Sequence, residues 1–190
     1  MTQLRENRRQ LLLRAAARLF REKGYARATI RDLAKAVALQ SGSIFHYFDS
    51  KDDILLGVMQ AAVSDAVTRL EDAYQAADGP EAGLRALVRA ELSLMHEEAT
   101  RDGMEVTFYE WDALMESSKQ ELLVLRERYE QTWAACLQEA RDAKMIRQDP
   151  AIVRRFTAGA LIWTAKWYRP GGELSMDDLT EQMVGLILHS

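Results

Sequence analysis

The sequence TIRDLAKAVALQSGSIFHYFDSKDDIL, residues 29–55, contains two short helical patterns, a turn between them and a cluster of aromatic side chains. The first helix is expected to begin after Thr29, with an apolar face made of Ile30, Leu33, Ala34 and Val37. A second helix is expected over about residues 40–47, after a turn of three or four residues. Two short helices joined in this way are typical of a helix-turn-helix, with Leu39 and Ile44 completing the buried face.

The aromatic cluster consists of Phe45, His46, Tyr47 and Phe48, four consecutive residues in a chain that has only 15 Phe, Trp and Tyr residues. A helix that only fills a core spaces its large apolar side chains three or four residues apart. Four in a row place rings on both the buried and the exposed face. We expect Phe48 and Phe45 to pack against the neighbouring helices, and His46 and Tyr47 to face outward.

The charge is distributed unevenly along the chain. Residues 1–51 contain 11 Lys and Arg against 4 Asp and Glu, a net charge of +7, whereas residues 52–190 contain 14 against 25, a net charge of −11. This pattern indicates that the N-terminal part binds an anion such as nucleic acid, although a solvated basic helix face would have the same composition. Arg5, Arg8 and Arg9 are either an arm that reaches the minor groove or simply solvated.

Composition and hydropathy indicate a cytoplasmic protein. The single cysteine, Cys136, excludes an intrachain disulfide, and its apolar neighbours predict that it is part of the core. The first ten residues are polar and charged, unlike a signal peptide. The longest apolar runs are far shorter than the ~20 residues that span a bilayer, so no membrane contact is expected.

Periodicity predicts an all-α protein of about nine helices joined by short loops. Pro80 and Pro150 are expected in first turns, and Ser50 and Ser175 are expected to cap the helices that follow them. The helices are expected at about residues 5–23, 30–37, 40–47, 50–77, 81–100, 104–111, 117–143, 150–168 and 176–188.

The stretch from Thr29 to Leu55 resembles the DNA-binding domain of the tetracycline repressor (TetR) family. The matching positions are Thr29, Ala34, Gly42, Ser43, Ile44, Phe48, Ser50 and Lys51. With the preceding LLLRAAARLFREKGY, the resemblance covers about 55 residues, and the rest of the chain matches in architecture only. It implies a helix-turn-helix DNA-binding domain over residues 1–50 and a helical ligand-binding and dimerisation domain over residues 51–190.

The resemblance also implies which residues contact double-stranded DNA. They are Thr29, Gln40, Ser41, Gly42, Ser43, Phe45, His46, Tyr47 and Lys51. Two positions depart from the family pattern. Ala38 replaces the usual glycine of the turn, which costs of order 1 kcal/mol if the residue is left-handed. Gln40 replaces the usual serine and is either a weak helix cap or a reader of an adenine edge; we favour the reader.

Catalytic, metal and cofactor sites are not expected. His96 and Glu97 begin an HExxH pattern, but the position of the second histidine is Thr100. The sequence has no glycine-rich phosphate loop and no nucleophile motif. We therefore expect a protein that is not an enzyme and needs no cofactor, with an all-α enzyme that has a basic N-terminus as the alternative of another class.

The segment KWYRPGGELSMDDL, residues 166–179, resembles the C-terminal turn of TetR-family members that regulate fatty-acid or steroid breakdown and respond to coenzyme A thioesters. That resemblance implies an acyl-CoA effector. The candidate ligand-binding residues are Tyr109, Trp111, Trp163, Lys166, Trp167 and Arg169. The acidic body favours the alternative of a multidrug-type regulator, in which aromatic side chains and acids such as Glu105, Glu110 or Asp112 hold a cationic or neutral lipophilic ligand.

Together these observations predict a homodimeric transcriptional repressor that a small-molecule effector releases from its operator. The last two helices contain small residues at Ala158, Gly159 and Ala165, so we expect them to pair across a two-fold axis. An architectural DNA-binding module without a ligand is the remaining alternative.

Overall fold

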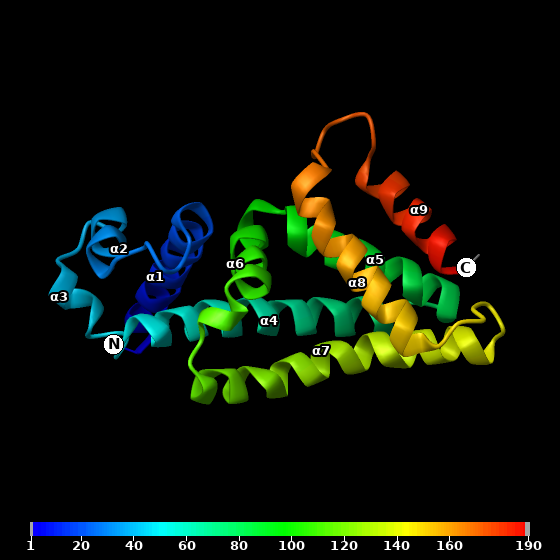
Figure 1. The fold of residues 1–190 in the computed structure, drawn as a ribbon, viewed down its shortest axis with the longest axis horizontal. Helices are drawn as coiled ribbons and strands as arrows, with labels where there is room; N and C mark the ends of the chain where they lie inside the picture. The colour runs from blue at the N-terminus through cyan, green and yellow to red at the C-terminus, as the bar shows by residue number, and fades with distance from the viewer. Residues whose placement is uncertain (1, 189–190) are drawn as a thin grey trace. The chain divides into compact units, whose positions relative to one another are not determined.

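The computed structural model describes residues 2–188, and within them the all-α prediction is confirmed. This part of the chain forms nine α-helices and one short 3₁₀ helix (Figure 1). In chain order they are α1 Thr2–Lys23, α2 Ile30–Ala36, α3 Ser41–Ile44, α4 Lys51–Gln75, α5 Pro80–His96, α6 Glu98–Tyr109, η1 Trp111–Ala113, α7 Glu116–Asp142, α8 Pro150–Trp167 and α9 Met176–Leu188. No described helix is both long and apolar enough to cross a membrane.

Most helix ends follow from the local sequence. Gly24, which follows α1, has the left-handed φ of 79° that favours glycine. Pro80 and Pro150 lie in the first turns of α5 and α8. The carboxylate of Asp149 accepts hydrogen bonds from the free N–H groups of Ala151 and Ile152, so it caps the start of α8.

Several helix boundaries differ from the prediction: α3 spans only Ser41–Ile44 where a helix over about residues 40–47 was expected, and the helix expected over about residues 104–111 is α6, Glu98–Tyr109. The sequence predicted a single helix over about residues 81–100, but α5 ends at His96, Glu97 has an extended backbone and α6 begins at Glu98. The reason is tertiary. The His96 ring bonds the Thr164 hydroxyl at 2.8 Å and packs edge-on against Tyr168, and both contacts fix the end of α5. No glycine or proline marks this break in the sequence.

The helices pack into two compact units. The first unit consists of the described residues up to Val63 together with Glu98–Leu125, and the second of Ser64–Glu97 together with the described residues from Arg126 onward. In the first unit, α1 packs against α2 and α6, and α2 packs against α3 (Figure 1). Its core is made of Leu12, Ala16, Phe20, Leu33, Ile44, Phe48 and Ile54.

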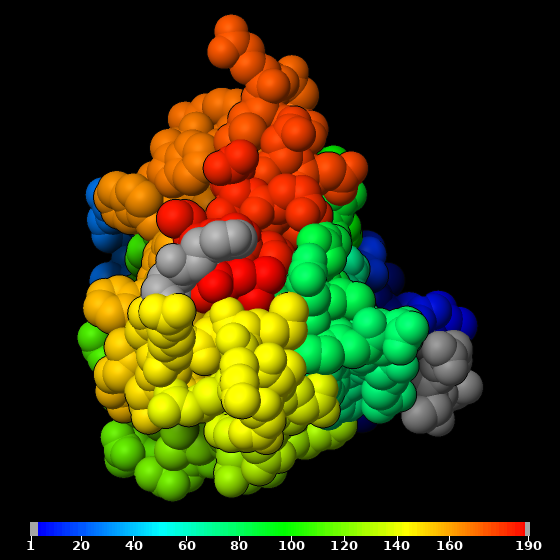
Figure 2. All heavy atoms as spheres, turned by 90° about the vertical axis from the view of Figure 1, so that its right-hand side faces the viewer, coloured from blue at the N-terminus to red at the C-terminus, as the bar shows by residue number. Residues whose placement is uncertain are grey.

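The second unit is built around α5, which packs against both α8 and α9. In Figure 2, the red atoms of α9 lie against the orange atoms of the end of α8 and the turn that follows it. Trp133, Cys136 and Leu137 of α7 are fully buried here, so the prediction that Cys136 is a core residue is confirmed. A cluster of charged and aromatic side chains is also enclosed in this unit.

Candidate nucleic-acid interface and small-molecule site

The turn between α2 and α3 is a Schellman motif. The Leu39 N–H donates to the Ala34 carbonyl oxygen at 2.8 Å, and the Ala38 N–H donates to that of Lys35 at 3.3 Å. Ala38 itself has a φ of 53°, which is the left-handed conformation in which glycine is usual. Ala38 is therefore left-handed, the condition under which the sequence predicted a strain of order 1 kcal/mol.

The short helix α3 separates a buried face from an exposed one. Ile44 and Phe48 lie four residues apart and are both buried, which fixes the helix against the core of the first unit. The predicted DNA-contact residues Thr29, Gln40, Gly42, Phe45 and His46 are exposed, and Ser41, Ser43, Tyr47 and Lys51 are half-buried. Seven of these residues lie in or beside α3, whereas Thr29 lies at the start of α2 and Lys51 at the start of α4, and DNA contact itself stays a prediction.

The expectation that Phe45 packs against the neighbouring helices is wrong. Its side chain is 53% exposed, whereas that of Phe48 is 2% exposed. α3 ends at Ile44, and Ile44 and Phe48 occupy the inward face, so the intervening residue Phe45 points outward. An exposed ring beside His46 is available to a partner.

Gln40 and Gly42 begin α3 with open space around them. Gln40 is the N-cap residue, but its side chain makes no capping hydrogen bond. At Gly42, a Cβ atom would meet nothing within 4 Å. The role of Gln40 as a base reader stays a prediction, and the bare backbone at Gly42 leaves room for close approach of a partner.

Thr29 has a structural role at the start of α2. Its hydroxyl oxygen accepts a hydrogen bond from the Asp32 N–H, and the Asp32 carboxylate accepts one from the Thr29 N–H, which together form a capping box. The Lys23 ammonium lies 2.9 Å from the same carboxylate. The hydrogen bond from Lys23, which has the largest effect, and those from Thr29 lower the pKa of Asp32 to about 2. These bonds fix the start of α2.

Lys51 begins α4 and contacts Tyr25. Its ammonium group donates to the Tyr25 carbonyl oxygen and lies over the Tyr25 ring. Burial lowers the pKa of Lys51, and the nearby Glu110 carboxylate acts in the opposite direction. That carboxylate also accepts a hydrogen bond from the Tyr25 N–H at 3.0 Å. The sequence predicted a phosphate contact for Lys51 and gave no sign of Tyr25 as its neighbour.

The N-terminal arginines are part of α1. Arg5 donates to the His46 carbonyl oxygen at 3.0 Å, and the Arg9 guanidinium lies 5.1 Å from the centre of the Phe48 ring. Both therefore contact the segment that follows α3. The sequence offered only a minor-groove arm or free solvation for these residues, so these contacts were missed.

Two further contacts within the first unit were also missed. The buried Asp52 carboxylate accepts hydrogen bonds from the Met115 N–H at 2.9 Å and the Ser118 hydroxyl at 2.5 Å. The Arg21 guanidinium pairs with Asp102 at 2.6 Å. These bonds tie α4 and α1 to the segment Glu98–Leu125, which lies far away in sequence.

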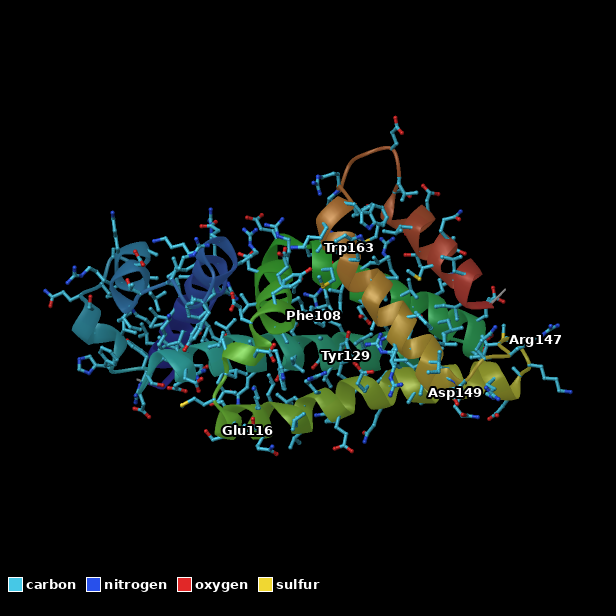
Figure 3. The ribbon with its side chains drawn as sticks, in the orientation of Figure 1. Phe108, Glu116, Tyr129, Arg147, Asp149 and Trp163 are labelled. Carbon is cyan, nitrogen blue, oxygen red and sulfur yellow. The ribbon has the colours of Figure 1, made fainter. Side chains whose placement is uncertain are left out.

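The predicted ligand-binding residues lie in both units. Tyr109 and Trp111 lie in the first unit, and Tyr109 is 48% exposed. The other four lie at the end of α8 and just after it in the second unit, where Trp163, Lys166, Trp167 and Arg169 are all exposed. Figure 3 labels Trp163 on α8. Their role in ligand binding stays a prediction.

One side of α8 is exposed and apolar. Ile152, Phe156 and Trp163 recur at helical spacing, and Phe156 is 77% exposed. Gly159 and Ala160 lie between them and are exposed too. Beside this stripe, a groove of about 380 Å³ separates α8 from α9, and Leu186 of α9 lines it together with Phe156. A monomer rarely exposes so many large apolar side chains on one helix without a partner.

The second unit encloses a charged cluster that the sequence analysis did not find. Arg154 of α8 pairs with the buried Glu91 of α5 at 3.3 Å and with Glu130 of α7 at 2.8 Å. Its guanidinium lies over the rings of Tyr129 and Trp133. Tyr129 and Trp133 are four residues apart on α7. This spacing in the sequence indicates that the two rings share one face of the helix.

Two family models match the chain. The one described as bacterial regulatory proteins of the tetR family matches residues 12–58, and the one described as a tetracyclin repressor-like C-terminal domain matches residues 77–190. The HTH-type transcriptional repressor KstR2 of Rhodococcus jostii (strain RHA1) is 26% identical over 187 residues, which cover 97% of this chain and 91% of KstR2.

Solved structures share the whole fold. The crystal structure of superantigen PfiT has 42% sequence identity and a TM-score of 0.80, and the match covers 96% of both chains. The crystal structure of AibR in complex with isovaleryl coenzyme A and operator DNA has a TM-score of 0.86 and covers 95% of this chain and 98% of that one. Its 21% identity shows a common fold only.

Proposed function

The chain belongs to the tetracycline repressor family of bacterial regulatory proteins, and from this premise we propose that it is a DNA-binding transcriptional repressor that a small-molecule effector releases from its operator. The observation that carries this proposal is the surface around α3. Small and polar residues there face outward, while Ile44 and Phe48 hold the helix in the core. We propose further that the chain acts in the cytoplasm and has no catalytic activity.

In this proposal residues 1–50 bind operator DNA, and residues 51–190 bind the effector and form the dimer. The net charge of +7 on residues 1–51 supports the first assignment. His46, Tyr47 and Lys51 contact phosphates and position the protein on the duplex. Gln40 reads a base edge, for which its side chain has no competing capping bond.

A second copy of the chain covers the exposed apolar side of α8. Phe156, Trp163 and Leu186 supply large side chains, and Gly159 and Ala160 allow two helices to approach closely. Pairing α8 and α9 with their two-fold copies would enclose this surface in a four-helix interface. A dimer also places its two recognition helices about one duplex turn apart, ~34–36 Å.

The effector proposed here is a coenzyme A thioester. AibR is described in complex with isovaleryl coenzyme A, and the turn that follows α8 resembles that of acyl-CoA-responsive family members. Trp163, Lys166, Trp167 and Arg169 remain candidate contacts near that turn, as do Tyr109 and Trp111 in the first unit. A ligand releases DNA only if it binds better to the conformation that does not fit the operator.

DNA binding is tested with duplex fragments from upstream of the gene. Raising salt from ~50 to ~200 mM should weaken binding about 10³-fold or more, because phosphate contacts release counterions. Salt-insensitive binding, or no binding to any fragment, would overturn the repressor proposal. In that case the superantigen role named for PfiT, at 42% identity, becomes the leading candidate and is tested by T-cell proliferation.

Effector release is tested separately, by adding coenzyme A thioesters of several chain lengths to the protein–DNA complex. Release with loss of tryptophan fluorescence is expected, and Trp167→Ala should reduce both while leaving ligand-free DNA binding intact. The exposed position of Trp167 makes unfolding of this variant unexpected. Release by a lipophilic cation and by none of the thioesters would reject the thioester.

A further inference from the structure

Tyr25 connects a carboxylate at the end of α6 to an ammonium group at the start of α4. Its N–H donates to Oε1 of Glu110 at 3.0 Å, and its carbonyl oxygen accepts a hydrogen bond from Lys51. The Lys51 ammonium nitrogen also lies over the Tyr25 ring, 4.1 Å from its centre. All three residues belong to the first unit, so a residue far from the helix-turn-helix in sequence is one residue away from Lys51 in space.

The way in which α1 ends makes the Tyr25 N–H available to Glu110. The Gly24 N–H donates to the Phe20 carbonyl oxygen at 2.8 Å, and Gly24 has a left-handed φ of 79°. In this kind of helix end, the N–H of the next residue takes no part in the helix. The bare Gly24 backbone also leaves room for the carboxylate, since a Cβ atom on Gly24 would lie 3.7 Å from Oε1 of Glu110.

The backbone of Glu110 is held on both sides. Its N–H donates to the Val106 carbonyl oxygen at 3.0 Å, and its own carbonyl oxygen accepts from the Ala113 N–H at 3.0 Å. Val106 is 1% exposed, and α6 packs against α1. The Glu110 carboxylate makes no capping bond to η1. Glu110 is therefore a firmly placed residue whose carboxylate holds Tyr25.

Neither charge stabilises the helix end at which it lies. Lys51 begins α4, where the positive end of the helix dipole disfavours a cation, and the Glu110 carboxylate lies at the negative end of α1. Each charge instead stabilises the other. Burial lowers the pKa of Lys51, and the Glu110 carboxylate acts against that fall. Glu110 thus favours the charged ammonium form, which a phosphate contact requires.

We infer that Glu110 is a positioning residue for DNA binding, and that through Tyr25 it holds the Lys51 ammonium group where it contacts a backbone phosphate. A lysine side chain loses conformational freedom when it binds, and holding it in advance lowers that cost. The inference rests on the proposed function for the statement that Lys51 contacts DNA. It goes beyond that function because it places a determinant of DNA affinity outside residues 1–50.

The test is Glu110→Ala, for which charge and positioning predict opposite results. Loss of an acid from the DNA-binding unit should by charge alone strengthen DNA binding. We expect binding to an upstream duplex to be about 5-fold weaker by fluorescence anisotropy, because Lys51 is no longer held. Glu110→Gln keeps an acceptor oxygen for the Tyr25 N–H and should restore most of the affinity. Glu116→Ala, at an exposed acid of the same unit that Figure 3 labels, is the matched control and should not weaken binding.

Two further measurements show whether Glu110 acts through Lys51. The double variant Lys51→Ala/Glu110→Ala should bind DNA as weakly as Lys51→Ala alone. Without DNA, acetic anhydride should label Lys51 faster in Glu110→Ala than in the wild type, as read by peptide mass spectrometry. Lys119, a half-buried lysine of the same unit, should react at the wild-type rate, which excludes a general loosening of the unit.

Glu110→Ala that binds DNA as tightly as the wild type, or more tightly, would overturn the inference. An equal loss of affinity from Glu110→Ala in the Lys51→Ala background would also overturn it, because Glu110 would then act elsewhere. Failure of the wild type to bind any fragment rejects the proposed function instead. In that case, faster labelling of Lys51 in Glu110→Ala would still show that Glu110 holds Lys51, and an unchanged rate would reject the positioning role as well.

Discussion

The ammonium nitrogen of Lys51 lies 4.1 Å from the centre of the Tyr25 ring and donates a hydrogen bond to the Tyr25 carbonyl oxygen. This contact connects the start of α4 to the segment that joins α1 and α2. An ammonium group has three donors, and the carbonyl uses one of them. Lys51 can therefore hold Tyr25 and contact a phosphate at the same time.

For Lys51→Ala we expect weaker binding to all DNA sequences and a log–log salt slope that is smaller by about 0.9, because one phosphate contact is lost. Fluorescence anisotropy at several salt concentrations measures both. Arg147→Ala is the matched control, since Arg147 is an exposed cation of the second unit, and it should leave the slope unchanged. Weaker binding with an unchanged slope would mean that Lys51 acts only by holding Tyr25.

Gln40→Ala should relax sequence preference at one or two base positions and change stability little, because the Gln40 side chain makes no capping bond. Selection of binding sites from a random pool, done in parallel with the wild type, gives the two motifs. Tyr47→Phe serves as the comparison, since losing a phosphate donor should weaken binding to all sequences alike. If Gln40→Ala selected the wild-type motif, Gln40 would not be a base reader.

Ala38→Gly should stabilise the protein by about 1 kcal/mol. Ala38 has a φ of 53°, where a Cβ atom is strained and glycine is not. Ala36→Gly is a control of opposite sign, because Ala36 ends α2 and glycine lowers helix stability by roughly 0.5–1 kcal/mol. Urea unfolding measures both variants. A loss of stability in Ala38→Gly would show that unfolded-chain entropy outweighs the relief of strain.

Much of the fold was predictable because its signals are local. The caps at Thr29 and Asp149 and the left-handed residues Gly24 and Ala38 depend on neighbours within a few positions. The outward position of Phe45 required knowledge of where α3 ends. Pairings across long sequence distances were not predictable in the same way.

Glu91 and Arg154 show why the cluster was missed. They are 63 positions apart, and a charged residue on an amphipathic helix normally faces solvent. Nothing in either local sequence reveals that a partner of opposite charge is buried against it. The exposed Trp163 was difficult for the converse reason, because a ring at helical spacing has the same pattern whether it lines a pocket, a core or an interface.

Phe156→Asp should convert the dimer into monomers and strongly weaken operator binding. Phe156 is 77% exposed in the isolated chain, so the change should leave the fold intact while placing a charge in the proposed interface. Light scattering after size exclusion measures the mass. Leu123→Asp is the control, because Leu123 is an exposed apolar residue of the first unit and should leave the dimer unchanged. A Phe156→Asp protein that remained dimeric would place the interface elsewhere.

The cap of α2 should make stability depend on pH in acid. Lys23 and Thr29 hold the pKa of Asp32 at about 2, below its value of about 3.9 in an unfolded chain. Between these values the unfolded state binds more protons, so the stabilisation is complete above about pH 5 and is lost as the pH falls towards 2. Asp32→Asn removes the titrating group. The difference in unfolding temperature between wild type and variant should therefore be constant above pH 5 and shrink between pH 4 and pH 2.

Asp49→Asn, at an exposed acid of the same unit, controls for the general loss of a negative charge. A difference for Asp32→Asn that stayed the same down to pH 2 would mean that the capping box works without the carboxylate charge.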